Sequence, residues 1–160
     1  VIYIDDRWLY EEEDDLPPVV ELNLSDQRPA VTQSGSDITI VGSGHASLLA
    51  RNAATILKNE QISAEVIDVR VLNPFFAEEI VSSVKKTKNI LVVDSGTLTA
   101  GFSAEIIAKV VEVLPVNCLK NKPMRIALPD APAPTSRFLE KDYYLYPEDI
   151  VQAVKKVLKD

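Results

Sequence analysis

Short runs of β-branched and aliphatic residues alternate along the chain with longer segments in which apolar residues recur at helical spacing. The strand-like runs cover residues 38–41, 64–69, 89–93 and 125–128. The helical segments cover residues 45–60, 77–86, 102–114 and 147–158. Strands separated by helices predict parallel βαβ units, because a parallel connection needs a crossover. We therefore predict an α/β fold, a three-layer α/β/α sandwich, with Ala30–Gln33 as an additional edge strand.

The stretch before this alternation is organised differently. Residues 1–10 have the pattern of one strand and its exit, and residues 11–36 form an acidic and then proline-containing linker that includes the edge strand. Residues 37–160 form the α/β domain itself. The chain opens at Val1 inside a strand-like run, and its only methionine is Met124. We therefore expect a fragment of a longer polypeptide.

Composition and charge exclude several classes of protein. Hydrophobic residues make up 46% of the chain and charged residues 26%, as in folded globular domains. A net charge of -7 argues against a nucleic-acid partner. No apolar run approaches the ~20 residues that span a bilayer, so we predict no membrane partner. Cys118 is the only cysteine, which excludes a disulfide within the chain and fits the cytoplasm or, in a eukaryote, the mitochondrial matrix.

A glycine-containing turn between the first parallel strand and its helix is one candidate site. Backbone amides in such a turn can hold an anion at the helix N-terminus. The turn resembles part of a dinucleotide fingerprint, and Asp68 ends the next strand, but Ser47 replaces the third glycine. A tight turn also needs glycine for conformational reasons alone. The candidate anion turn consists of Gly42, Ser43, Gly44 and His45.

Three further segments are candidates for contacts with partners. One follows the third parallel strand, where ligands and partners meet open α/β sheets. The second, residues 129–136, is too rich in proline for a helix or a central strand and should be stiff and extended. The third is a tyrosine cluster, which suits contact surfaces that are apolar at one end and wet at the other. The candidate interface residues are Asp94, Ser95, Gly96, Gly101, Pro132, Pro134, Tyr143, Tyr144 and Tyr146.

With these segments in view, the chain resembles the beta subunits of thiamine-diphosphate-dependent 2-oxo acid dehydrogenases along nearly its whole length. Residues 1–10 (VIYIDDRWLY) resemble the last strand of their pyrimidine-binding domain, and residues 34–41 (SGSDITIV) the start of their carboxy-terminal domain. Residues 65–74 (EVIDVRVLNP) are the most specific match, supported by residues 93–105 and 129–146. Transketolase shares the domain more distantly. Ala100 departs from the pattern, because many relatives have a glycine there.

The resemblance implies a mixed five-stranded sheet with one antiparallel edge strand. It also implies a heterotetramer in which this chain would contact an alpha subunit, a second beta subunit and the subunit-binding domain of a dihydrolipoyl acyltransferase. The complete enzyme uses thiamine diphosphate and Mg²⁺. The diphosphate-binding signature, Gly-Asp-Gly followed by paired asparagines, is absent from this chain. The activating glutamate would lie upstream of Val1.

The leading interpretation is thus a subunit-assembly domain of a 2-oxo acid dehydrogenase beta subunit that is inactive in isolation. No catalytic, cofactor-binding or metal-binding residue is assigned to it. Two alternatives stay open: a stand-alone nucleotide- or anion-binding α/β module that uses the candidate anion turn, and the carboxy-terminal domain of a transketolase-type enzyme. The identity of the 2-oxo acid is not encoded in this stretch of sequence.

Overall fold

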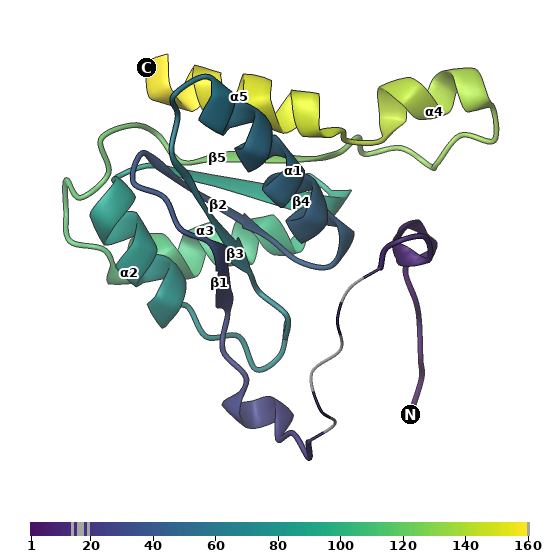
Figure 1. The fold of residues 1–160 in the computed structure, drawn as a ribbon, viewed down its shortest axis with the longest axis horizontal. Helices are drawn as coiled ribbons and strands as arrows, with labels where there is room; N and C mark the ends of the chain where they lie inside the picture. Colours follow the sequence, from purple (N-terminus) through teal and green to yellow (C-terminus); the bar gives the residue numbers. More distant parts are fainter. Residues whose placement is uncertain (14, 16–17, 19, 160) are drawn as a thin grey trace.

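A single five-stranded sheet forms the centre of the molecule, with the strand order β1-β3-β2-β4-β5 (Figure 1). The computed structural model describes residues 1–13, 15, 18 and 20–159. Four neighbouring strands are parallel, and β1 pairs antiparallel with β3 at one edge. This confirms the predicted sheet and its edge strand. The strands are β1 (Ala30–Gln33), β2 (Ile38–Gly42), β3 (Ala64–Asp68), β4 (Ile90–Thr97) and β5 (Met124–Leu128).

Helices cover both faces of the sheet, as the three-layer prediction requires. Helices α1 (His45–Asn59) and α5 (Pro147–Lys159) pack on one face, and α2 (Glu78–Thr87) and α3 (Phe102–Val113) pack on the other. Ile38 and Ile40 of β2 join the α1–α5 core, whereas Val41 joins the α2–α3 core. Successive side chains of a strand point to opposite faces, so a strand buried on both faces is apolar at most of its positions.

Three short helices lie outside this pattern. The 3-10 helices η1 (Arg7–Leu9) and η2 (Leu24–Asp26) belong to the N-terminal stretch. Helix α4 (Arg137–Tyr143) projects from the end of the domain (Figure 1) and contributes no buried residue. Its side chains Phe138 and Leu139 are 84% and 59% exposed. No helix in the described part of the chain is long and apolar enough to cross a bilayer.

The strand expected in residues 1–10 is assigned to an upstream domain, and that assignment stays a prediction. Residues 1–6 form no strand, and Arg7–Leu9 is a 3-10 helix whose start is capped by Asp6. A strand needs a pairing partner for its backbone groups, and the described residues offer none here. Residues 14, 16, 17 and 19 of the predicted linker and Asp160 of the predicted domain lie outside the described residues. The boundaries 1–10, 11–36 and 37–160 stay predictions.

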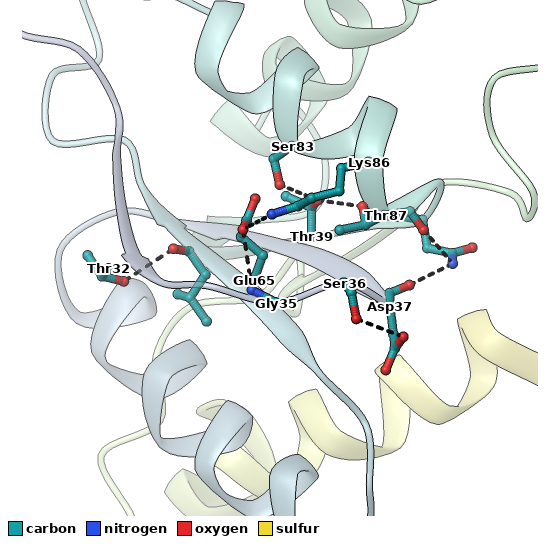
Figure 2. Close-up of polar contacts among 11 residues, drawn as sticks. Thr32, Gly35, Ser36, Asp37, Thr39, Glu65, Ser83, Lys86 and Thr87 are labelled. Atoms are coloured by element: carbon teal, nitrogen blue, oxygen red, sulfur yellow. Dashed lines mark hydrogen bonds and ion pairs between the residues drawn. The ribbon is translucent and has the colours of Figure 1, made fainter.

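A buried polar network ties β2 and the start of β4 to α2 (Figure 2). The Thr39 hydroxyl, which is fully buried on β2, lies 2.6 Å from the Ser83 hydroxyl and 2.7 Å from the Thr87 hydroxyl. Thr87 in turn donates to the backbone carbonyl of Asn89, directly before β4. Buried hydroxyls that are all hydrogen-bonded fix one arrangement of their elements. The network therefore sets how α2 lies against the sheet.

Glu65 of β3 forms a second polar contact beside this network. Its side chain is only 4% exposed, forms an ion pair with Lys86, and accepts a hydrogen bond from the Gly35 amide at 3.3 Å. Burial pushes the pKa of Glu65 upward, but the hydrogen bonds from Lys86, Ser83 and Gly35 outweigh it, so its pKa lies below the ordinary value. Figure 2 shows Glu65 pointing toward both Gly35 and Lys86. This carboxylate thus connects the segment before β2 to α2.

Candidate functional site

Three segments singled out from the sequence leave the carboxyl ends of neighbouring strands. The candidate anion turn follows β2, residues 94–101 end β4, and residues 129–136 follow β5, and these strands are adjacent in the sheet. Strand β2 continues through α1 to β3 on one side, whereas β4 continues through α3 to β5 on the other. Such a reversal of direction is where open α/β sheets bind ligands. We call this edge of the sheet the carboxyl-end surface.

The candidate anion turn has a packing reason for its glycines. A Cβ on Gly42 would lie 2.9 Å from backbone atoms of Ala46 and Ser47, so only glycine lets α1 start this close to β2. Gly44 has a positive φ of 54°, which glycine adopts readily. The amides of Ala46 and Ser47 donate to the carbonyls of Ser43 and Gly44. These two amides in the first turn of α1 are therefore already engaged within the turn.

The surroundings of Asp68 also bear on an anion at this turn. Asp68 lies in the same shallow depression as Gly44 and Arg51, together with the carboxylates of Glu12 and Glu13. Burial raises the pKa of Asp68, against the opposing effects of the Arg70 amide and the charges of Arg70 and Arg51. A raised pKa means that ionised Asp68 is unfavourable, so its contribution to stability falls as the pH rises through that pKa. Among the described residues of this depression, the carboxylates of Asp68, Glu12 and Glu13 outnumber the one cation, Arg51. Anion binding by the turn stays a prediction.

The segment after the third parallel strand corrects one sequence expectation. The strand was predicted to end at residue 93, but β4 runs to Thr97, so Asp94, Ser95 and Gly96 belong to it. The reason is pairing with β5 at a distance in sequence, since Thr97 pairs with Leu128 after a shift of register beyond Asp94.

Two carboxylates hold the rest of this segment in place. Asp94 accepts from the Gly96 amide at 2.8 Å and from the Ser103 amide in the first turn of α3 at 2.7 Å. Asp130 accepts from the Thr99 amide at 3.1 Å and from its hydroxyl at 2.6 Å. These hydrogen bonds hold the pKa of Asp130 below its usual value. The exposed residues between them are therefore presented on a fixed backbone.

Ala100 lies in this segment with a strained backbone, which gives a testable expectation. Its φ of 57° is in the left-handed region that favours glycine. We expect Ala100→Gly to raise the free energy of unfolding by about 0.5–1 kcal/mol. Relief of the backbone strain in the folded state should outweigh the entropy that glycine adds to the unfolded chain. Urea denaturation followed by circular dichroism measures it. Ala108→Gly, at an exposed position inside α3, should instead lower stability by about 1 kcal/mol. A destabilising Ala100→Gly would contradict this reading of the backbone.

The tyrosine cluster reaches both the proline-rich segment and the N-terminal stretch. The Tyr143 hydroxyl donates to the carbonyl of Ala131 at 2.9 Å, next to the exposed Pro132 and the half-buried Pro134. Tyr143 and Tyr144 meet edge to face with ring centroids 5.1 Å apart. The structure thus brings two of the predicted interface segments into direct contact.

Tyr146 is fixed separately, as the residue before α5. Its amide donates to the Asp149 carboxylate at 2.8 Å, and its carbonyl accepts from the Asp149 amide at 3.1 Å. The Asp149 carboxylate thus satisfies the amide of the residue before α5, which is the side-chain half of a capping box. Tyr146 is 39% exposed at the carboxyl-end surface.

Trp8 is a residue of this surface that the sequence interpretation did not single out. Its ring stacks on the His45 ring, with centroids 5.6 Å apart and an interplanar angle of 18°, and meets Tyr144 edge-on at 5.4 Å. The sequence offered only one hint of this contact, a single tryptophan two residues after Asp6. Aspartate is a residue type that favours the N-cap position of a helix. Phe138 and Leu139 of α4 were also missed, because seven residues give too few turns to display a period.

Comparisons with known proteins agree with this geometry. The family described as transketolase, C-terminal domain, matches residues 28–150. A pyruvate dehydrogenase E1 component subunit beta from Rickettsia felis is 32% identical across 98% of this chain and 48% of the relative. A mitochondrial 2-oxoisovalerate dehydrogenase subunit beta 2 from Arabidopsis thaliana is 35% identical across 70% of this chain and 31% of the relative.

Among solved structures, an inactive beta4 tetramer of a split-gene transketolase superposes with a TM-score of 0.75 and 26% identity, covering 92% of this chain and 46% of that one. The chain thus spans about half the length of the first of these relatives, and of the solved chain. The family match covers all five strands and helices α1 to α4, and it ends inside α5. The chain belongs to the transketolase C-terminal domain family.

Proposed function

We propose that this chain is the carboxy-terminal assembly domain of a 2-oxo acid dehydrogenase beta subunit and does no chemistry alone. The observation that carries the proposal is its similarity, across 98% of its length, to beta subunits of pyruvate dehydrogenase from Rickettsia felis and Dictyostelium discoideum. Its compartment would be that of such relatives, which includes mitochondria, as the Dictyostelium name states.

The residues that the structure describes do not fit the cofactor of a 2-oxo acid dehydrogenase. Thiamine diphosphate and Mg²⁺ call for oxygen ligands around the ion and groups that bind the diphosphate. No cluster of three or more His, Cys, Asp or Glu side chains suitable for a metal occurs among the described residues. A cavity opens at the carboxyl-end surface. Its described lining residues include the carboxylate of Asp6 but no lysine or arginine. In our proposal the cofactor is therefore held by other parts of the enzyme.

The carboxyl-end surface supports a role in subunit contacts. It combines the exposed apolar side chains of α4, Phe138 and Leu139, with Leu98 at 42% and Tyr146 at 39% exposure. These residues lie on segments that follow β4 and β5, beside the proline-rich segment with Pro132 and Pro134. Large apolar side chains on a fixed backbone are typical of interface anchors. We propose that a dehydrogenase alpha subunit covers this surface.

The proposal predicts a loss of binding when the α4 anchors are made polar. A chain with Phe138→Ser and Leu139→Ser should bind the alpha subunit of the same organism about tenfold or more weakly, because exposed apolar anchors dominate interface energies. Isothermal titration calorimetry with the purified alpha subunit measures this. Neither side chain is buried, so folding should be unaffected, which circular dichroism checks.

The matched control is Val116→Ser. Val116 is 91% exposed but lies in the connection that enters the amino end of β5, at the opposite edge of the sheet. This variant should bind like the unaltered chain. Binding that is equal in all three chains would remove α4 from the interface, and absence of any binding would count against the assembly proposal. An acyltransferase subunit-binding domain is the second partner to titrate.

A transketolase-type enzyme is a second candidate, favoured by the 0.75 TM-score to the split-gene transketolase chain. The two candidates differ in substrate, because one acts on 2-oxo acids and the other on sugar phosphates. An assay of the assembled complex with both substrate classes separates them. Turnover of sugar phosphates alone would replace our first proposal with the second.

A further inference from the structure

A cavity of about 290 Å³ opens at the carboxyl-end surface. Its walls come from η1, from the side of α1, from the ends of β4 and β5, and from the segment before α5. It therefore lies where β2 and β4 send their connections in opposite directions, the usual ligand position in an open α/β sheet. The volume is at the small end of the range for ligand pockets, about 300–1,000 Å³.

Aromatic rings dominate the wall. Trp8, His45, Tyr144 and Tyr146 all line the cavity, and the remaining contacts are mostly aliphatic. The stacked pair of Trp8 and His45 and the edge-on contact of Tyr144 with Trp8 hold the rings against one another. Tyr146 is anchored through Asp149 at the start of α5. The rings thus form a preorganised set drawn from three parts of the chain.

The charge at the wall is negative. Asp6 lines the cavity, and its Oδ1 accepts the Trp8 amide at 3.1 Å, which fixes the carboxylate beside the rings. No lysine or arginine occurs among the described residues of the wall. The first-turn amides of Ala46 and Ser47 are engaged with the carbonyls of the turn. An anion would therefore meet repulsion from Asp6 and from the net charge of -7.

We propose that this cavity binds a small organic cation with an apolar shell, such as a quaternary ammonium group. Aromatic faces attract such cations through their quadrupoles, and a nearby carboxylate adds attraction without requiring a hydrogen bond. The cavity shares Tyr146 with the surface proposed for the alpha subunit, whereas the other anchors of that surface, Phe138, Leu139 and Leu98, do not line it. The inference depends on the cavity alone and holds for a dehydrogenase or a transketolase-type enzyme.

Trp8 makes the test direct, because it is the only tryptophan and stands in the wall. Three probes of one shape are titrated at constant ionic strength while its fluorescence is followed: choline, the uncharged isostere neohexanol, and the tert-butylacetate anion. We expect a saturable change with choline, binding about tenfold weaker for neohexanol, and no saturation for the anion. Equal affinity for the first two probes, or no saturable response to choline, would overturn the proposal.

Variants separate the charge from the shape of the site. Asp6→Asn should reduce the preference for choline over neohexanol to the part that the aromatic rings supply, while asparagine still caps η1 and keeps Trp8 in place. Asp26→Asn, at an exposed acid in η2, is the matched control and should keep the preference. Tyr144→Leu should weaken choline binding about tenfold with the fold intact by circular dichroism. An Asp6→Asn chain that still prefers choline as strongly as before would show that the carboxylate plays no part.

Discussion

Replacing Glu65 with alanine is expected to lower the free energy of unfolding by about 2 kcal/mol. The change leaves the Gly35 amide and the Lys86 ammonium without their acceptor. The Glu65 side chain that is removed is only 4% exposed. The estimate stays at the low end for a broken ion pair because Lys86 is 50% exposed and can turn to water. Urea denaturation at neutral pH measures the loss. An unaltered midpoint would mean that the pair contributes nothing to stability.

Glu65→Gln tests the charge alone through its pH dependence. Burial and the opposing hydrogen bonds leave the pKa of Glu65 below its ordinary value of 4.5. A carboxyl with a lowered pKa stabilises the fold fully above the unfolded pKa, and this contribution is lost as the pH falls through the folded pKa. Stability should therefore decline below about pH 4.5 in the unaltered chain and decline less steeply in Glu65→Gln. Glu112→Gln, at an exposed position on α3, controls for the removal of one negative charge.

The central sheet could be predicted because its signals are local. The β-branched run of β2 and the alternation of its residues between two cores follow from the pleat of a buried strand. The start of α5 was set by Pro147 together with Glu148 and Asp149, which suit the first turn of a helix. These features depend on neighbours in sequence, so one sequence is enough to find them.

The features that were missed depend on distant partners. The extension of β4 through Asp94 and Gly96 is held by pairing with β5 and by the shift of register there, which no local pattern reveals. Polar and glycine residues are poor strand formers in isolation, so the sequence favoured a loop. Helix α4 buries no residue and therefore shows no apolar stripe.

The candidate site was foreseen only in part, for the same reason. The sequence placed the turn at Gly42 after the first parallel strand and the segment from Asp94 after the third, and it singled out the tyrosine cluster only as a contact segment. It did not pair Trp8 with His45 and Tyr144, because these contacts join residues far apart in the sequence. The cavity between them is a tertiary feature without a signal in any one segment.

Gly101→Ala is expected to lower the free energy of unfolding by about 3 kcal/mol. Gly101 precedes α3 with an ordinary negative φ of -72°, so its requirement is space and not backbone freedom. A Cβ there would lie 2.1 Å from the Thr97 carbonyl oxygen and 2.8 Å from Oδ2 of Asp94. Because Oδ2 accepts the Ser103 amide, the new methyl group would displace the cap of α3 as well as the backbone of β4.

Gly96→Ala is the matched control within the same segment. Its Cβ would lie 3.1 Å from Oδ1 of Asp94, a side-chain atom that can move by a few tenths of an ångström, so its loss should be about 1 kcal/mol or less. Hydrogen exchange of the Ser103 amide distinguishes the two, since only Gly101→Ala should remove its protection. If both variants lost equal stability and kept the Ser103 amide protected, the cap would not be what holds this segment. A loss of stability in Gly101→Ala alone would mean that the close approach of β4 to α3 fixes the backbone of the carboxyl-end surface.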